Sequence, residues 1–299
     1  MPNGTGVVEL ALVCGLPMLA APDPLGAHTA GLGVVIADAL RTGVSELAVA
    51  VGGSASTDGG TAALAALGAR FLDTVGRELP YGGGALPALA AFDATGLTPP
   101  PPGGVQILTD VGNPLLGPQG AARVFGPQKG ADSDDLAVLE AGLARLAAAL
   151  GGDPTAPGTG AAGGTAYGFA AAWSATITSG AARIAELISL DVALADADLV
   201  VTGEGRFDAT SLQGKVAGTV LGFAARQRHR TPVALVAGSV AAPLPVGVAA
   251  ALSLTDLAGS PAAATADAAH WLHRAGRLLA ARFTGVQEPR DPVKRRSSS

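Results

Sequence analysis

The chain has 299 residues, of which 48% are hydrophobic and 14% charged, and its formal net charge is -5 at pH 7. The negative balance argues against general affinity for nucleic acid or anionic membranes, so an anionic ligand must be held by a local group of side chains. The single cysteine, Cys14, excludes an internal disulfide and is expected in the core.

Short apolar runs of strand length recur along the chain and end at glycine or aspartate, at 47–51, 105–108, 199–201 and 233–236. Such runs are typical of buried parallel strands. The clearest helix is 133–150, with leucines on one face, Ser133 as the expected cap and Gly151 as the stop. Alternating strands and helices predict an α/β protein with ligands at the strand ends, and the length favours two domains or one large α/β unit.

The segment 231–255 is apolar enough to raise the question of a membrane span, but proline and glycine interrupt it. We therefore expect two buried strands around a turn. The first ten residues lack the pattern of a secretion signal, so a cytoplasmic location is expected. The tail 286–299 is polar and is expected to be disordered.

The first candidate site motif is GGSASTDGG at 52–60, which follows a predicted strand and precedes a predicted helix from about Thr61. Glycines such as Gly53 let backbone amides face a ligand, Ser54 adds a hydroxyl, and a helix start favours an anion. Asp58 could then orient a hydroxyl or a metal ion. The alternative is a tight strand-to-helix connection with Ser or Thr caps.

The second motif is TDVGNPLLGPQGAARVFGPQKGA at 109–131. Asp110 ends a strand, Asn113 precedes a proline that fixes the turn, and Lys129 can bind a polyol or a phosphate. An ordinary structural loop is the alternative.

The third motif is DLVVTGEGRFDATSLQGKV at 198–216, which places Glu204, Arg206, Asp208 and Lys215 in a glycine-containing turn directly after an apolar strand. Glu204 and Asp208 could hold magnesium, with waters and phosphate oxygens completing the shell. Arg206 and Lys215 could neutralise charge on a transferring phosphoryl group. The alternative is a salt-bridge cluster that only fixes the loop.

Two further patterns do not fit their context. The G-x-G-x-x-G spelling at 158–163 follows a proline-rich loop instead of a strand, which argues against a nicotinamide site. His270 and His273 are one turn apart on a predicted helix without a third ligand nearby, which argues against a metal site.

The three motifs, together with GAAGGTAYGFAAA and VALVAGSV, occur in an order that resembles the bacterial type I glycerate kinase family, from about Thr5 to about Arg282. The resemblance implies ATP-dependent phosphorylation of glycerate with magnesium. It also implies two α/β domains: an inserted domain resembling restriction endonucleases at 4–197, and the C-terminal part of a flavodoxin-like domain at 198–282. Family members carry about 70 further residues in front, including a D-S-F-K-G motif, so we expect an incomplete flavodoxin-like domain here.

The resulting hypothesis is a glycerate kinase that uses ATP and Mg, with 2-phosphoglycerate as the favoured product. Lys215, Arg206 and Asp208 are the expected catalytic residues, and Glu204 and Asp208 the metal ligands. Substrate and phosphate contacts are expected from Gly53, Ser54, Asp58, Asp110, Asn113 and Lys129. We predict that the carboxylates and cations of all three motifs, among them Asp58, Asp110, Asp208 and Lys215, converge on one cleft that takes a triphosphate and a small hydroxy acid. A non-catalytic homologue that binds glycerate or nucleotide is the alternative, and a dinucleotide-dependent oxidoreductase is a third. A small-molecule substrate is expected, without nucleic acid or membrane, and a homodimer is the candidate assembly.

Overall fold

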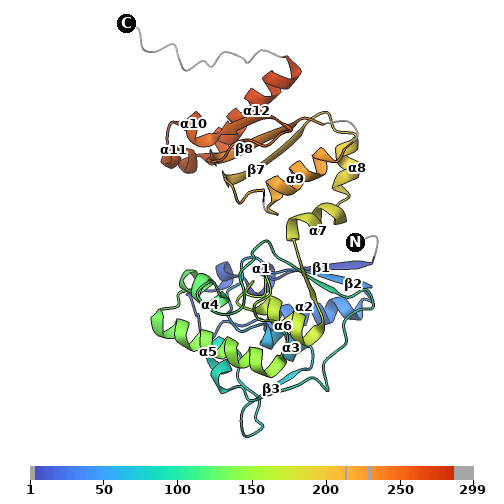
Figure 1. Cartoon of the computed structure of the whole chain (residues 1–299), viewed down its shortest axis with the longest axis vertical. Helices are drawn as coiled ribbons and strands as arrows, with labels where there is room; N and C mark the ends of the chain where they lie inside the picture. Colours follow the sequence, from blue (N-terminus) through green and yellow to red (C-terminus); the bar gives the residue numbers. More distant parts are fainter. Residues whose placement is uncertain (1–3, 213, 228–230, 286–299) are drawn as a thin grey trace. The chain divides into compact units, whose positions relative to one another are not determined.

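The computed structural model describes residues 4–212, 214–227 and 231–285. The chain divides into two compact units, Met1–Gly180 and Ala181–Ser299, and each contains a parallel sheet with helices (Figure 1). The predicted α/β fold is confirmed. The predicted tail 286–299 lies outside the described residues.

The division between the units lies earlier than the predicted boundary at 197. Residues 181–197 group with the second unit because α8 (Leu190–Ala195) packs on α9 (Val216–Ala225). The side-chain amide of Gln227, just after α9, also donates to the carbonyl of Asp191 at 3.2 Å. The resemblances of the two domains to endonucleases and flavodoxins stay predictions.

The first unit is built on a four-stranded parallel sheet in the order β1-β2-β5-β6. In this register Val8 pairs with Val49, and Val49 pairs with Ile107. The strands predicted at 47–51 and 105–108 are therefore neighbours, and the loops that follow them leave the same edge of the sheet. The strands are β1 (Thr5–Glu9), β2 (Glu46–Ala50), β5 (Val105–Leu108) and β6 (Thr176–Thr178).

Helices of the first unit pack on this sheet and on one another. Helix α2 (Ala30–Arg41) contacts β1 and α3 (Thr61–Ala66), and α6 (Thr165–Trp173) contacts β5, β6 and α5 (Ser133–Leu150). The remaining elements are short: α1 (Ala11–Cys14), η1 (Leu16–Met18), η2 (Gly83–Ala88), α4 (Ala121–Phe125), η3 (Pro127–Lys129), and the antiparallel pair β3 (Arg70–Leu72) and β4 (Ala91–Asp93).

Helix α5 has the bounds that the sequence predicted, but a different cap. Asp132 precedes the helix, and its carboxylate accepts from the backbone N–H groups of Asp134 and Asp135, both at 2.9 Å. The backbone N–H of Asp132 in turn donates to Asp135 Oδ2 at 3.2 Å, which completes a capping box. Ser133 is therefore the first helical residue and not the cap, because the carboxylate one position earlier already holds the free amides.

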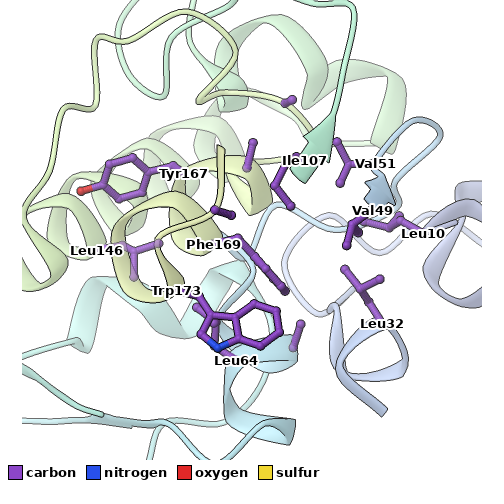
Figure 2. Close-up of a cluster of buried hydrophobic side chains, with 14 of the residues drawn as sticks. Leu10, Leu32, Val49, Val51, Leu64, Ile107, Leu146, Tyr167, Phe169 and Trp173 are labelled. Atoms are coloured by element: carbon purple, nitrogen blue, oxygen red, sulfur yellow. The ribbon is translucent and has the colours of Figure 1, made fainter. Parts of the chain in front are cut away.

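The core of the first unit is built mainly from aliphatic side chains, and α6 adds the aromatic rings of Tyr167, Phe169 and Trp173 (Figure 2). The rings of Phe169 and Trp173 meet edge to face, 5.6 Å between centroids. The Trp173 indole N–H donates to the carbonyl of Thr98 at 2.7 Å, which satisfies the one polar group of that side chain. Cys14 belongs to this core, as predicted.

The second unit has a parallel sheet in the order β7-β8-β9. Its strands are β7 (Val200–Phe207), β8 (Val233–Val240) and β9 (Val248–Ser253), and its other helices are α7 (Gly180–Leu187), α10 (Leu254–Ala258), α11 (Pro261–Ala266) and α12 (Ala268–Thr284). The predicted reading of 231–255 as two strands around a turn is confirmed. Within the described residues no helix is both long and apolar enough to span a membrane.

Candidate functional site

The loop 52–60 leaves the carboxyl end of β2 and leads into α3, as the sequence predicted. Gly53 has a φ of +71°, in the left-handed region that glycine adopts without strain. This turn lets the chain reverse directly after the strand. Leu16 then donates its N–H to the Gly53 carbonyl at 3.0 Å, and Ala55 donates to the carbonyl of Cys14 at 3.1 Å, so the backbone around Ser54 is fixed.

Asp58 is fully buried at the start of α3. Its Oδ2 accepts from the backbone N–H of Thr29 at 2.9 Å and from the Thr29 hydroxyl at 2.8 Å, and its Oδ1 accepts from the N–H of Gly60 at 3.2 Å. These contacts fix the loop to the start of α2. A direct contact between Asp58 and a ligand stays a prediction.

Lys129 ends the short helix η3 and is buried, with 2% of its surface exposed. Its Nζ donates to Ser54 Oγ at 2.9 Å and to the Ser56 carbonyl at 2.5 Å. Burial lowers the pKa of Lys129 from 10.5 to about 8, against the opposing attraction of Asp58. The second predicted motif thus delivers its cation into the first.

A cavity of about 380 Å³ opens beside this lysine. It lies where the loops after β2 and β5 meet the segment 161–163, so it occupies the expected end of a parallel sheet. The lining combines apolar side chains with few polar groups: Leu16, Pro17, Val51, Gly52, Gly53, Ser54, Thr109, Val111, Phe125, Gln128, Lys129, Ala161, Ala162 and Gly163.

Asp110 and Asn113 fix the loop after β5 and do not line this cavity. Asp110 Oδ1 accepts from the Ser179 hydroxyl at 3.2 Å and from the N–H of Gly180 at 2.9 Å. The Asn113 amide donates to the carbonyl of Gln119 at 2.8 Å. Both contacts fit the structural alternative for this motif, and their contact with substrate stays a prediction.

In the second unit Arg206 lies near the end of β7, and Asp208 and Lys215 lie in the turn between β7 and α9. Asp208 Oδ1 accepts from the N–H of Thr210 at 2.9 Å and from its hydroxyl at 2.7 Å, and Lys215 Nζ donates to the same hydroxyl oxygen at 2.8 Å. Arg206 Nε lies 3.6 Å from Asp208 Oδ2. The Thr210 hydrogen bonds, with smaller help from Lys215 and Arg206, hold the pKa of Asp208 below its ordinary value.

Lys215 stands at the N-cap position of α9. The free amides and the dipole at this end of the helix favour an anion, and the Lys215 ammonium adds to that field. The turn therefore offers two cations and a helix start in one short segment.

Glu204 lies earlier on β7, beside an apolar groove of about 1150 Å³ along β7, β8, α11 and α12. Its Oε1 is buried and has no hydrogen-bond partner in the described part of the chain. A carboxylate oxygen left in this state suits a cation, since an unpaired buried acceptor is costly. The described residues hold no cluster of three or more His, Cys, Asp or Glu side chains around one point, so Glu204 and Asp208 fit only a metal that shares its shell with water and phosphate.

Comparison with known proteins shows the relationship of the chain. The sequence model of the glycerate kinase family matches residues 1–284. The chain belongs to the glycerate kinase family. It is 38% identical over 290 residues to the glycerate kinase of Bacillus subtilis, covering 93% of this chain and 75% of that protein. It is 38% identical over 244 residues to the glycerate 2-kinase of Escherichia coli, covering 78% and 64%.

A crystal structure from Salmonella typhimurium LT2, presented as a candidate glycerate kinase 2, superposes with a TM-score of 0.70. The sequence identity is 37%, and the match covers 83% of this chain and 67% of that one. The family match begins at the first residue and gives no support to the expectation that a front segment of the family is missing.

Sequence reasoning missed three groups that shape the first-unit site. Thr29 holds Asp58, the Ser56 carbonyl holds Lys129, and Gly163 lies against Ser56, where a Cβ would be 2.2 Å from that carbonyl oxygen. Thr29 and the Ser56 carbonyl carry no local signal for these contacts, because each acts through a contact between distant segments. Gly163 lies inside a G-x-G-x-x-G spelling and has a positive φ of +63°. Its residue type indicates this conformation, because glycine adopts a positive φ without strain.

Proposed function

We propose that the protein is an ATP-dependent glycerate kinase that transfers the γ-phosphoryl group to a glycerate hydroxyl, with 2-phosphoglycerate as the favoured product. Family membership carries this proposal, supported by 38% identity to the glycerate kinase of Bacillus subtilis over 93% of the chain. Phosphoryl transfer depends mainly on positioning and charge neutralisation, and both units offer groups for these tasks. A cytoplasmic location and a homodimer are part of the same proposal.

In the second unit, Lys215 and Arg206 are proposed to face the phosphoryl oxygens. Their geometry supports this role, because Lys215 stands at the start of α9, and Arg206, near the end of β7, has its Nε 3.6 Å from Asp208 Oδ2. Cations placed where negative charge develops lower the barrier to transfer. Asp208 holds the turn through Thr210 and keeps a carboxylate beside both cations.

Glu204 and Asp208 are proposed to hold magnesium together with phosphate oxygens and water. The unpaired Oε1 of Glu204 supports this assignment. When bound, the ion would neutralise charge on the phosphate oxygens. In the first unit, the cavity beside Lys129 and Ser54 is proposed to take the acceptor.

The test is ADP release by the purified full-length chain, followed in a coupled assay with and without glycerate. Glycerate-dependent ADP release supports the proposal. Calorimetry against glycerate and ATP is run beside it. Binding of either ligand without any ADP release would contradict the kinase proposal and favour a non-catalytic binding protein.

A further inference from the structure

The first-unit cavity contains a set of hydrogen-bond donors that its own protein contacts leave unfilled. A protonated lysine has three N–H donors, and Lys129 donates two of them to Ser54 Oγ and the Ser56 carbonyl. Ser54 Oγ accepts one of these bonds, and its own hydroxyl hydrogen meets no acceptor among the described residues. One ammonium hydrogen and one hydroxyl hydrogen are therefore left at the cavity wall.

The backbone of the same loop adds donors of the same kind. No described protein group accepts from the N–H of Gly52 or of Gly53, although both residues line the cavity. Among the described residues that line the cavity, only Lys129 is ionisable, so no carboxylate of this lining competes for these donors. Asp58, whose charge attracts Lys129, is itself held by Thr29 and Gly60. The wall thus offers donors and one cation to an acceptor that the protein does not supply.

The charge and size of the cavity decide which anion fits. One buried ammonium balances a single negative charge, whereas a nucleotide triphosphate would bring several charges and require further cations. A volume of about 380 Å³ suits a small organic acid. The apolar wall, which includes Leu16, Val51 and Phe125, can cover the carbon chain of such a ligand.

We propose that this cavity binds the carboxylate of the acceptor acid, with Lys129 Nζ and Ser54 Oγ as its side-chain donors. The identity of the acid as glycerate rests on the proposed function. The site itself rests on the geometry. It selects a hydroxy acid over a polyol of the same size, because a neutral alcohol cannot balance the buried ammonium.

The state of Lys129 gives this proposal a signature that a merely structural lysine would not produce. An anion binds the ammonium form, and the pKa of Lys129 in the free protein is about 8. The apparent Kd for glycerate is therefore expected to be constant below this pH and to rise about tenfold per pH unit above it. Glycerate stays fully ionised across the same range, so the ligand does not contribute to the change.

Calorimetric titration of the full-length chain tests the site with glycerate, glycerol and inorganic phosphate at pH 7 and pH 9.5. We expect glycerate to bind at pH 7 and to lose at least tenfold in affinity at pH 9.5, and glycerol not to bind. Lys129→Met should weaken glycerate at least tenfold at pH 7 and remove the pH dependence, and Ser54→Ala should weaken it less. Arg145→Met, which removes an exposed cation from α5, is the control and should leave the Kd unchanged.

Circular dichroism of each variant shows whether it is folded, and the pH profile of the unmodified protein needs no variant. Equal affinity for glycerate and glycerol, or unchanged glycerate binding by a folded Lys129→Met variant, would overturn the proposal. So would competitive displacement of glycerate by phosphate at tighter affinity, since the cavity would then be a phosphate site. Glycerate binding without ADP release would support the carboxylate site and contradict the proposed kinase activity. Glycerate-dependent ADP release by Lys129→Met with an unchanged KM would support the kinase activity and overturn the carboxylate site.

Discussion

Thr29 donates two hydrogen bonds to the carboxylate of Asp58. Asp58 Oδ2 accepts from the Thr29 backbone N–H at 2.9 Å and from its hydroxyl at 2.8 Å, and the Thr29 hydroxyl oxygen accepts in turn from the N–H of Ala63 at 3.0 Å. Both side chains are fully buried. The pair ties the start of α2 to the start of α3 and holds the loop that carries Ser54.

Thr29→Val keeps the shape of the side chain and removes this hydroxyl. The buried carboxylate then loses a donor and Ala63 N–H loses its acceptor, so we expect a loss of about 2 to 4 kcal/mol in the free energy of unfolding. Urea denaturation measures it. Thr42→Val is the control, because the Thr42 hydroxyl donates to Ala39 in an exposed position at the end of α2. Equal losses in the two variants would contradict a special role for the pair.

Gly163 supports the seat of Lys129 by leaving room for the Ser56 carbonyl. A Cβ at this position would be 2.2 Å from Ser56 O, so Gly163→Ala must displace the acceptor of the lysine. We expect a loss of several kcal/mol in unfolding free energy and a weaker affinity for glycerate. Gly104→Ala is the matched control, since Gly104 also has a positive φ but no heavy atom near its Cβ position.

The difference between these two alanine variants isolates the steric contact from the backbone strain that they share. Unfolding in urea and calorimetric titration of glycerate supply the two measurements. If Gly104→Ala destabilises the protein as much as Gly163→Ala, the contact with Ser56 contributes nothing measurable.

The buried lysine makes stability depend on alkaline pH. Its folded pKa of about 8 lies below its ordinary value of 10.5, so the unfolded chain binds more protons between these limits. Stability contributed at Lys129 therefore rises as the pH increases through this window, and below pH 8 the cost of burying the ammonium is present in full. Across the window the change is on the order of 3 kcal/mol.

Comparison with Lys129→Met isolates the contribution of Lys129 to the pH dependence of stability, because other groups titrate alike in both proteins. The unfolding free energy of the unmodified protein minus that of the variant should stay flat below pH 8 and rise from pH 8 to 10.5. A difference that is constant over the whole range would show that the lysine keeps its ordinary pKa in the folded state.

Lys215→Ala is expected to lower kcat on the order of a hundredfold or more, because it removes a cation from the proposed phosphoryl-transfer turn. The substitution also frees the Thr210 hydroxyl from Lys215 while leaving its bond to Asp208. Steady-state ADP release measures the effect. Lys294→Ala removes a lysine from the polar C-terminal segment and serves as the control. Unchanged turnover in Lys215→Ala would remove that residue from the mechanism.

The sequence predicted the framework of the fold because its signals are local. Buried strands at 105–108 and 233–236 and the leucine face of α5 depend on residues that are neighbours in the chain, and the structure contains each of them. The sequence predicted Ser133 as the cap of α5, whereas the structure has Asp132 in that position. Two adjacent side chains could each accept from the first turn, and only geometry shows that Asp132 does so.

The site was predictable in part for a related reason. Glycine-rich loops at strand ends pointed to Ser54 and Lys129 separately, but nothing in the sequence indicated that the two side chains contact each other. The 2.9 Å hydrogen bond between Lys129 Nζ and Ser54 Oγ joins positions 75 residues apart. Hydrophobic periodicity is a local pattern and does not predict a contact between such distant residues. The buried state of Lys129 was equally hidden, since a lysine between glutamine and glycine suggests an exposed turn. Thr29 carried no signal at all, because its partner lies in a different motif.

One edge of the second sheet has a consequence for handling the protein. β7 pairs with β8 alone among the described residues, so its other side presents backbone N–H and C=O groups without strand partners. An exposed strand edge of this kind can pair with an extended segment of another chain. Glycines at 203 and 205, alternating with Glu204 and the exposed Arg206, weaken that tendency by breaking up apolar side chains and adding charge. Neutralising either charge should therefore favour self-association in concentrated solution.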